Sequence, residues 1–329
     1  MNLHAAAAYA THLLKARSTA GHGVHSPFMF RFITEVIGGR SDRSIIREVE
    51  SLRKEMVSDR RVVQVRDLGA GSVVMGKGER SVRKIAFVAA VPKREAALLA
   101  RIAGSLDKIR SGGAETDDIS VDECEGVILE LGTSLGISTL ALALGAPHRK
   151  VISVEGSPEL ATIARENLLR HGAHNAEVLC MEFGEALALL NSMSTKVALA
   201  FIDGNHRGAA LTEYVNRIRE MGEEMIIIAD DIHMNRDMIC AWRSIAEWTT
   251  APASVAGRGK QTPDLETGPA SGAGPARQAT TGGNVPTSGA GTAVQPSADK
   301  IAAASLETFR MGMLFCLRNL TPGRYRVRY

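Results

Sequence analysis

The stretch Val-Ile-Leu-Glu-Leu-Gly-Thr-Ser-Leu-Gly-Ile-Ser-Thr at residues 127–139 decides the fold of this chain. Its first residues form a short apolar run that ends at Glu130 and Leu131, which is typical of a buried strand. Gly132 and Gly136 then form a turn without side chains, where a ligand can come close to the backbone. A helix that starts at such a turn points its backbone N–H groups at the ligand. The stretch therefore predicts a small-molecule pocket between a strand and a helix.

The same strand-and-helix pattern continues along the chain. Strands are predicted at residues 127–131, 151–155, 177–180, 197–202 and 225–229. A helical segment follows each of them, and the last of these helices is expected at residues 235–248. Strands that alternate with helices indicate a doubly wound parallel sheet with right-handed crossovers. Such a sheet binds its ligands at the carboxyl ends of its strands.

Composition divides the rest of the chain. We expect an N-terminal helical lid region at residues 1–120 and the α/β core at 121–250. Residues 251–300 are rich in Gly, Ala, Ser, Thr and Pro, so they cannot bury enough apolar surface to fold and are predicted to be disordered. Residues 301–329 supply two more strands, which completes a mostly parallel seven-stranded sheet. The insertion should lie at the amino ends of the strands, away from the ligand.

Charge and cysteine content exclude several classes of protein. The net charge of +3 over 329 residues does not demand nucleic acid or an anionic membrane as a partner. The four cysteines form no C-x-x-C pair, which argues against a zinc site and a disulfide framework. No apolar run reaches the roughly 18 residues of a membrane span. We therefore expect a soluble cytoplasmic protein with no membrane partner.

Two stretches near the N-terminus imitate functional motifs. Residues 62–72 resemble the deciding stretch, with a β-branched run followed by an acid and glycines, but no helix start follows the glycines. We interpret them as a loop. His22 and His25 lack a local cluster of further metal ligands, and Ser26 before Pro27 instead predicts the N-cap of a helix.

Acidic residues end several of the predicted strands. Glu155 follows the glycine turn by about 20 residues, the offset at which an acid binds ribose hydroxyls. Residues 181–184 combine apolar and acidic side chains suited to adenine. A nucleoside-containing ligand is therefore implied. A dinucleotide signature would need glycines in place of Ser134 and Ile137, which disfavours NAD.

The pattern Glu-x-Gly-x-x-x-Gly followed by Glu155 resembles class I S-adenosylmethionine-dependent methyltransferases. Together with Phe-Ile-Asp-Gly-Asn-His at 201–206 and Ile-Ala-Asp-Asp at 228–231, it looks like the catechol O-methyltransferase-like branch and an uncharacterised bacterial subgroup of it. The resemblance covers about residues 120–248 and implies a Rossmann-like methyltransferase fold. It implies cofactor contacts from Glu130, Gly132, Thr133, Ser134, Gly136, Ser138, Glu155, Gly156, Glu182 and Asp203.

The same resemblance implies a divalent cation. Asp203, Asp230 and Asp231 stand at the family's metal positions, and hard oxygen ligands suit Mg²⁺. The alternative is that these acids are ordinary turn residues at strand ends, although three converging carboxylates would repel one another. His206 stands where the family often has its general base and can accept a hydroxyl proton at neutral pH. His233 is the competing base.

We therefore expect metal-assisted O-methylation of a small-molecule hydroxyl, with His206 and Asp203 as catalytic residues. The N-terminal helices and the connection at residues 309–312 should cover the acceptor. A tRNA or protein acceptor is the first alternative, and a basic C-terminal tail is its only support. A non-catalytic scaffold that binds S-adenosylmethionine and an NAD-dependent oxidoreductase are the others. The identity of the acceptor and a homo-oligomeric state cannot be decided from the sequence.

Overall fold

The computed structural model describes residue 16 and residues 19–65, 78–106, 125–248, 303–317 and 320–329. Those before residue 250 and after residue 301 belong to one compact unit. The disorder predicted for residues 251–300 falls on a part of the chain that lies outside the described residues. None of the helices in the described ranges has the length and apolar character that crossing a membrane requires.

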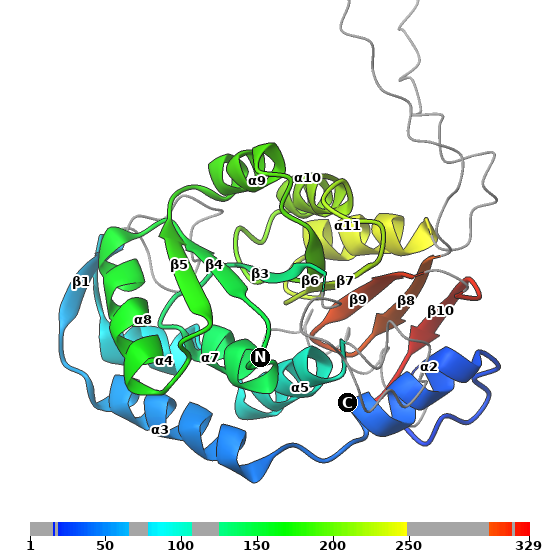
Figure 1. Ribbon diagram of the computed structural model, residues 1–329, viewed down its shortest axis with the longest axis horizontal. Helices are drawn as coiled ribbons and strands as arrows, with labels where there is room; N and C mark the ends of the chain where they lie inside the picture. The colour runs from blue at the N-terminus through cyan, green and yellow to red at the C-terminus, as the bar shows by residue number, and fades with distance from the viewer. Residues whose placement is uncertain (1–15, 17–18, 66–77, 107–124, 249–302, 318–319) are drawn as a thin grey trace, which may run out of the picture. The chain divides into compact units, whose positions relative to one another are not determined.

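An eight-stranded sheet forms the centre of this unit, in the order β10-β8-β9-β7-β6-β3-β4-β5 (Figure 1). The strands are β3 (Val127–Leu131), β4 (Val151–Glu155), β5 (Ala176–Cys180), β6 (Val197–Ile202), β7 (Met225–Ala229), β8 (Ala303–Glu307), β9 (Gly312–Cys316) and β10 (Gly323–Arg326). All run parallel except β9, which is antiparallel to β7 and β8. The predicted mostly parallel sheet is confirmed, with one strand more than expected because β10 pairs with β8.

Helices cover both faces of the sheet, as expected for a doubly wound fold. They are α7 (Ile137–Gly145), α8 (Pro158–Arg170), α9 (Phe183–Ser192), α10 (Gly208–Arg219) and α11 (Arg236–Glu247). Successive strand residues point to opposite faces, so Phe201 packs in the cluster under α7 and α8, while Ala200 packs under α10 and α11. The central strands β6 and β7 are apolar throughout because both of their faces are buried.

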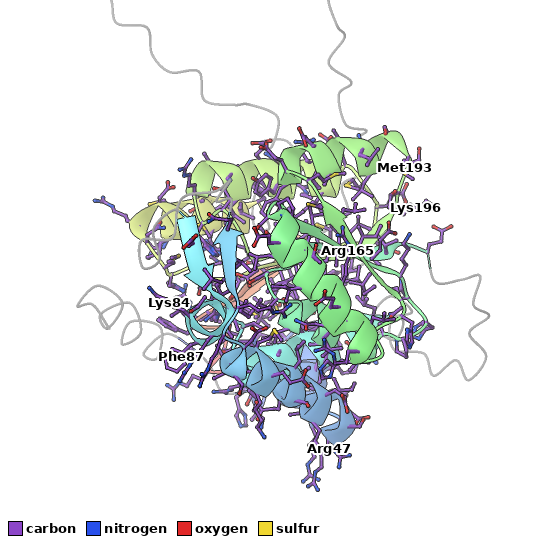
Figure 2. All side chains as sticks on the ribbon, turned by 90° about the vertical axis from the view of Figure 1, so that its left-hand side faces the viewer. Arg47, Lys84, Phe87, Arg165, Met193 and Lys196 are labelled. Carbon is purple, nitrogen blue, oxygen red and sulfur yellow. The ribbon has the colours of Figure 1, made fainter. Side chains whose placement is uncertain are left out.

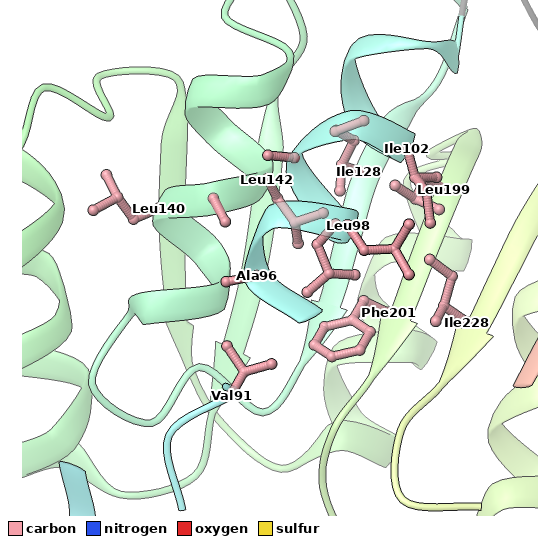
Figure 3. Close-up of a cluster of buried hydrophobic side chains, with 14 of the residues drawn as sticks. Val91, Ala96, Leu98, Ile102, Ile128, Leu140, Leu142, Leu199, Phe201 and Ile228 are labelled. Atoms are coloured by element: carbon pink, nitrogen blue, oxygen red, sulfur yellow. The ribbon is translucent and has the colours of Figure 1, made fainter. Parts of the chain in front are cut away.

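Helices from the N-terminal region belong to the same core. They are α2 (Pro27–Arg31), the π-helix η1 (Phe32–Ile37), α3 (Arg43–Ser58), α4 (Val82–Val88) and α5 (Lys93–Gly104). Figure 3 shows Leu98 of α5 among Leu142 of α7 and the strand residues Leu199 and Phe201. Helix α2 begins as predicted, because Ser26 accepts a hydrogen bond from the Met29 N–H at 3.4 Å.

The stretch interpreted as a loop at residues 62–72 begins as a strand, so that part of the prediction was wrong. Strand β1 (Val62–Val65) pairs antiparallel with β2 (Gly78–Ser81), and the glycines between them lie outside the described residues. The hairpin binds to the start of α8, where the Gln64 N–H donates to Glu159 at 3.0 Å. Figure 2 shows the hairpin close to α8. A strand needs a partner to form, and the partner here comes from beyond the glycines.

Strand β8 begins at the edge of the sheet where β7 also begins. Ala303 and Met225 both lie opposite Cys316 of the antiparallel strand β9. Strand β8 therefore starts at the amino ends of the parallel strands. The carboxyl ends, where the predicted site residues lie, are on the opposite edge.

Candidate cofactor and acceptor site

The glycine turn after β3 packs directly against the turn after β6. The Asp203 N–H donates to the Leu131 carbonyl at 2.9 Å. Gly132 has a φ of +111°, and a Cβ atom at this position would lie 2.2 Å from the Asp203 carbonyl oxygen. Only glycine fits both the backbone conformation and the contact. The close approach brings the start of the predicted cofactor site beside the predicted catalytic residues.

Glu155 at the end of β4 is fixed beside the glycine turn. Its carboxylate accepts hydrogen bonds from the Ser134 N–H at 2.8 Å and from the Ser157 N–H at 2.9 Å. Burial raises the pKa of Glu155, while the N–H groups of Ser157, Ser134 and Gly156 lower it. Each carboxylate oxygen still has a lone pair for a further donor. This geometry suits two neighbouring ribose hydroxyls.

Glu130 lies beneath the turn and is fully buried. Its Oε2 accepts hydrogen bonds from the hydroxyls of Ser153, at 2.5 Å, and Thr139, and the nearby Ser138 hydroxyl lowers the pKa of the carboxyl group. Burial raises the pKa of Glu130 to about 7. Within the described part of the chain, the buried Oε1 has no hydrogen-bond partner. Thr133 is 1% exposed and bonds to Ser153 at 2.5 Å, so these polar side chains support the turn from below.

The predicted adenine-binding segment follows β5 on the same edge. The Met181 N–H donates to the Glu155 carbonyl at 3.1 Å, which places this segment next to the ribose acid. Glu182 is exposed and stands at the N-cap position of α9, where its side chain makes no capping hydrogen bond. The ring of Phe183 covers Gly204, where a Cβ atom would lie 2.6 Å from the ring. The structure therefore brings the ends of β4, β5 and β6 together on one edge.

The acids at the ends of β6 and β7 meet an arginine from the connection between β8 and β9. The Arg310 Nε lies 2.8 Å and 2.9 Å from the two carboxylate oxygens of Asp230, and its Nη2 lies 2.7 Å from Oδ2. The same Nη2 is 3.4 Å from Asp231 Oδ1. Asp230 is completely buried, so its charge is balanced by Arg310 and not by solvent.

This arrangement does not fit the predicted magnesium site. In the described ranges, no group of three or more His, Cys, Asp and Glu side chains is placed to hold a metal ion. Asp203, Asp230 and Asp231 do lie in one electrostatic cluster, but both oxygens of Asp230 are occupied by Arg310. No local sequence pattern predicts this pair, because Arg310 follows Asp230 by 80 positions in the chain.

Burial and neighbouring charges shift the pKa values of Asp203, Asp230 and His206. Burial, followed by the charges of Asp230 and Asp231, raises the pKa of Asp203 well above its ordinary value, and Arg310 opposes this. Burial also raises the pKa of Asp230 to about 6. His206 Nε2 lies 3.9 Å from Asp203 Oδ1, and burial lowers the pKa of His206. A neutral imidazole at neutral pH can accept a proton.

His233, the competing base, supports the β8–β9 connection. Its Nδ1 lies 2.7 Å from the Phe309 carbonyl oxygen, so this nitrogen carries the proton and donates it. The ring also stacks on Phe309, with centroids 5.4 Å apart. These contacts give His233 a structural role, and His206 is the histidine next to an acid of the predicted site.

Residues 129–232 match a family model described as a methyltransferase domain. The described fold, the glycine turn and the strand-end acids agree with that match. Over these residues the chain is therefore similar to class I S-adenosylmethionine-dependent methyltransferases of the catechol O-methyltransferase-like kind.

Two characterised proteins and one solved structure are similar to the chain. Catechol O-methyltransferase of Mycobacterium tuberculosis is 35% identical over 109 residues, which are 32% of this chain and 47% of that protein. Release factor glutamine methyltransferase of Vibrio cholerae is 45% identical over 53 residues, 16% of this chain and 18% of that protein. The chain thus spans less than half the length of either relative. An O-methyltransferase from Bacillus cereus, solved in complex with SAH, has 16% identity and a TM-score of 0.42 over 68% of this chain and 84% of its own.

Proposed function

We propose that the protein transfers the methyl group of S-adenosylmethionine to the oxygen of a small-molecule hydroxyl. The observation that carries the proposal is the juxtaposition of the glycine turn with Asp203, which joins a nucleoside-binding geometry to an acid and a neutral histidine. The similarity to a catechol O-methyltransferase supports an oxygen acceptor. The carboxyl edge of the sheet is also where this fold binds its ligands.

The residues present fit the cofactor. The Glu155 carboxylate would accept hydrogen bonds from the ribose, next to Gly156, and Glu182 would lie near the adenine. The methionine part would lie over the turn from Gly132 to Gly136, with the buried carboxylate of Glu130 beneath it. Thr133, Ser134 and Ser138 then hold the shape of the turn.

The chemical step needs a proton acceptor and an aligned hydroxyl. As the acceptor oxygen attacks the methyl carbon, the carbon–sulfur bond breaks and its electron pair stays on sulfur. The hydroxyl proton moves to Nε2 of His206, which later releases it to water. The charge of Asp231 raises the pKa of His206 and so stabilises the protonated ring, and Asp203 lies 3.9 Å from the same nitrogen. The metal assistance expected from the sequence is not part of this mechanism, because Arg310 holds Asp230.

A second candidate has one observation in its favour. The similarity to a release factor glutamine methyltransferase supports a protein acceptor and the same cofactor. A tRNA acceptor has only the basic residues near the C-terminus as support, and one of them, Arg326, is paired with Glu307 at 2.6 Å. A non-catalytic scaffold would not need a neutral histidine beside an acid.

Methyl transfer from labelled S-adenosylmethionine to a panel of phenols and catechols tests the proposal. Wild-type protein should label at least one member, and His206→Gln should lower kcat by about 10²- to 10⁴-fold, the usual contribution of a general base. His174→Gln, at an exposed histidine away from the site, should leave kcat unchanged. Label found only in protein or tRNA would favour the second candidate.

A further inference from the structure

The buried ion pair between Arg310 and Asp230 stands where the sequence predicts a divalent cation. We infer that Arg310 is the resident cation of the acidic cluster and that the cluster therefore works without a divalent metal. The role of the cluster in methyl transfer rests on the proposed function, whereas the exclusion of the metal follows from the ion pair alone. Arg310 is accordingly a positioning residue for the acids at the ends of β6 and β7.

The guanidinium takes the oxygens that a metal would need. Its Nε contacts both carboxylate oxygens of Asp230, at 2.8 Å and 2.9 Å, and its Nη2 contacts Oδ2 of Asp230 at 2.7 Å and Oδ1 of Asp231 at 3.4 Å. Mg²⁺ binds carboxylate oxygens at about 2.0–2.1 Å with strict geometry. A guanidinium and a metal cannot occupy the same position, so one cation excludes the other.

Hydrogen bonds hold the backbone on both sides of Arg310, and this directs its side chain toward the acids. The Ile232 N–H donates to the Arg310 carbonyl at 3.1 Å, and His233 donates to the Phe309 carbonyl at 2.7 Å. The turn itself is closed by Thr308 and Met311, whose N–H groups donate to the Met311 carbonyl and the Thr308 hydroxyl, each at 2.9 Å. The connection is therefore bound to the segment that follows Asp230.

Charge and exposure indicate what the guanidinium can do there. It supplies one positive charge to three carboxyl groups, and it lowers the pKa of Asp203 and Asp230 against the effect of burial. Its side chain is 28% exposed. Nε and Nη2 bind the acids, whereas Nη1 has no hydrogen bond to any residue that the structure describes.

Titration of Mn²⁺ into the full-length protein tests the inference, with binding followed by calorimetry and by the Mn²⁺ electron paramagnetic resonance signal. Wild-type protein should bind no Mn²⁺ at this site. Arg310→Gln should gain Mn²⁺ binding that both calorimetry and the resonance signal detect, because the acids lose their resident cation. Combining Arg310→Gln with Asp230→Asn should abolish the gain.

The matched control is Arg326→Gln. Arg326 is also 28% exposed and also binds a buried acid, Glu307, at 2.6 Å through Nε, but it lies outside the cluster. Its replacement should leave Mn²⁺ binding at the wild-type level. If Arg326→Gln gained the same Mn²⁺ binding as Arg310→Gln, the gain would come from breaking any buried ion pair. That result would contradict the inference.

Two further outcomes would overturn it. In the first, wild-type protein binds Mn²⁺ and the Asp230→Asn variant does not. This comparison is decisive even if Arg310→Gln does not fold. The other is a folded Arg310→Gln variant with no gain in affinity. Titration of S-adenosylhomocysteine into the same samples reports on the proposed function separately, because its failure to bind leaves the Mn²⁺ results interpretable.

Discussion

Replacing Glu130 with Gln should change how stability depends on pH. The folded protein holds this buried carboxyl group at a pKa of about 7, against an ordinary value of 4.5. Each pKa unit corresponds to about 1.4 kcal/mol, so ionising Glu130 costs the folded state about 3 kcal/mol. Gln keeps an acceptor oxygen for the Ser153 and Thr139 hydroxyls but cannot ionise.

The direction follows from the raised pKa. Because the folded state holds the proton to a higher pH than the unfolded chain, the stability that protonated Glu130 contributes is complete below pH 4.5 and is lost as the pH rises through 7. Wild-type protein should lose this contribution between those values, and Glu130→Gln should not. Relative to wild type, the variant should therefore gain about 3 kcal/mol between pH 5 and pH 8.

Urea unfolding at pH 5 and at pH 8 measures this difference. The amide NH₂ group of the variant lacks a partner, which lowers stability by the same amount at both pH values. This cost therefore cancels when the change between pH 5 and pH 8 is compared. Glu177→Gln is the control, since Glu177 is exposed and bonds only to Lys150, at 2.8 Å, in the described ion pairs. If the difference in unfolding free energy between Glu130→Gln and wild type stayed constant from pH 5 to pH 8, the raised pKa of Glu130 would be refuted.

Three other substitutions test separate parts of the site. Glu155→Ala should weaken S-adenosylhomocysteine binding about 10- to 100-fold in calorimetry, because a charged hydrogen bond contributes about 1.5–3 kcal/mol, and unchanged affinity would exclude the ribose contact. Gly132→Ala should destabilise the fold by about 3 kcal/mol in urea, because its Cβ would meet the Asp203 carbonyl and its φ is unfavourable. Arg310→Met should cost about 3–5 kcal/mol at pH 8 by leaving Asp230 buried and unpaired, and adding Asp230→Asn should recover part of the loss; equal stability of the single and double variants would contradict this.

Local sequence patterns were sufficient to predict the core strands. β3, β4, β6 and β7 are mainly apolar strands buried on both faces, and each is followed by turn residues, so their positions could be predicted directly. The ribose acid was also predictable, because the distance from the glycine turn to Glu155 is set by one helix and one strand. Structure adds the Ser134 and Ser157 N–H groups that hold it.

Features that depend on distant partners could not be predicted in the same way. β10 carries four residues of mixed exposure, Gly323–Arg326, and becomes a strand by pairing with β8. The hairpin strand β1 likewise needs β2 from beyond its glycines. Arg310 resembled any arginine in a turn, and its pairing with Asp230 depends on how the strands on either side of the insertion are brought together.

Calorimetric titration of S-adenosylhomocysteine, S-adenosylmethionine and NADH into the full-length protein tests the central claim most directly. The account predicts that both adenosyl ligands bind with one site per chain, that NADH does not bind, and that added Mg²⁺ leaves the affinities unchanged. Failure of both adenosyl ligands to bind, or binding of NADH in their place, would contradict it.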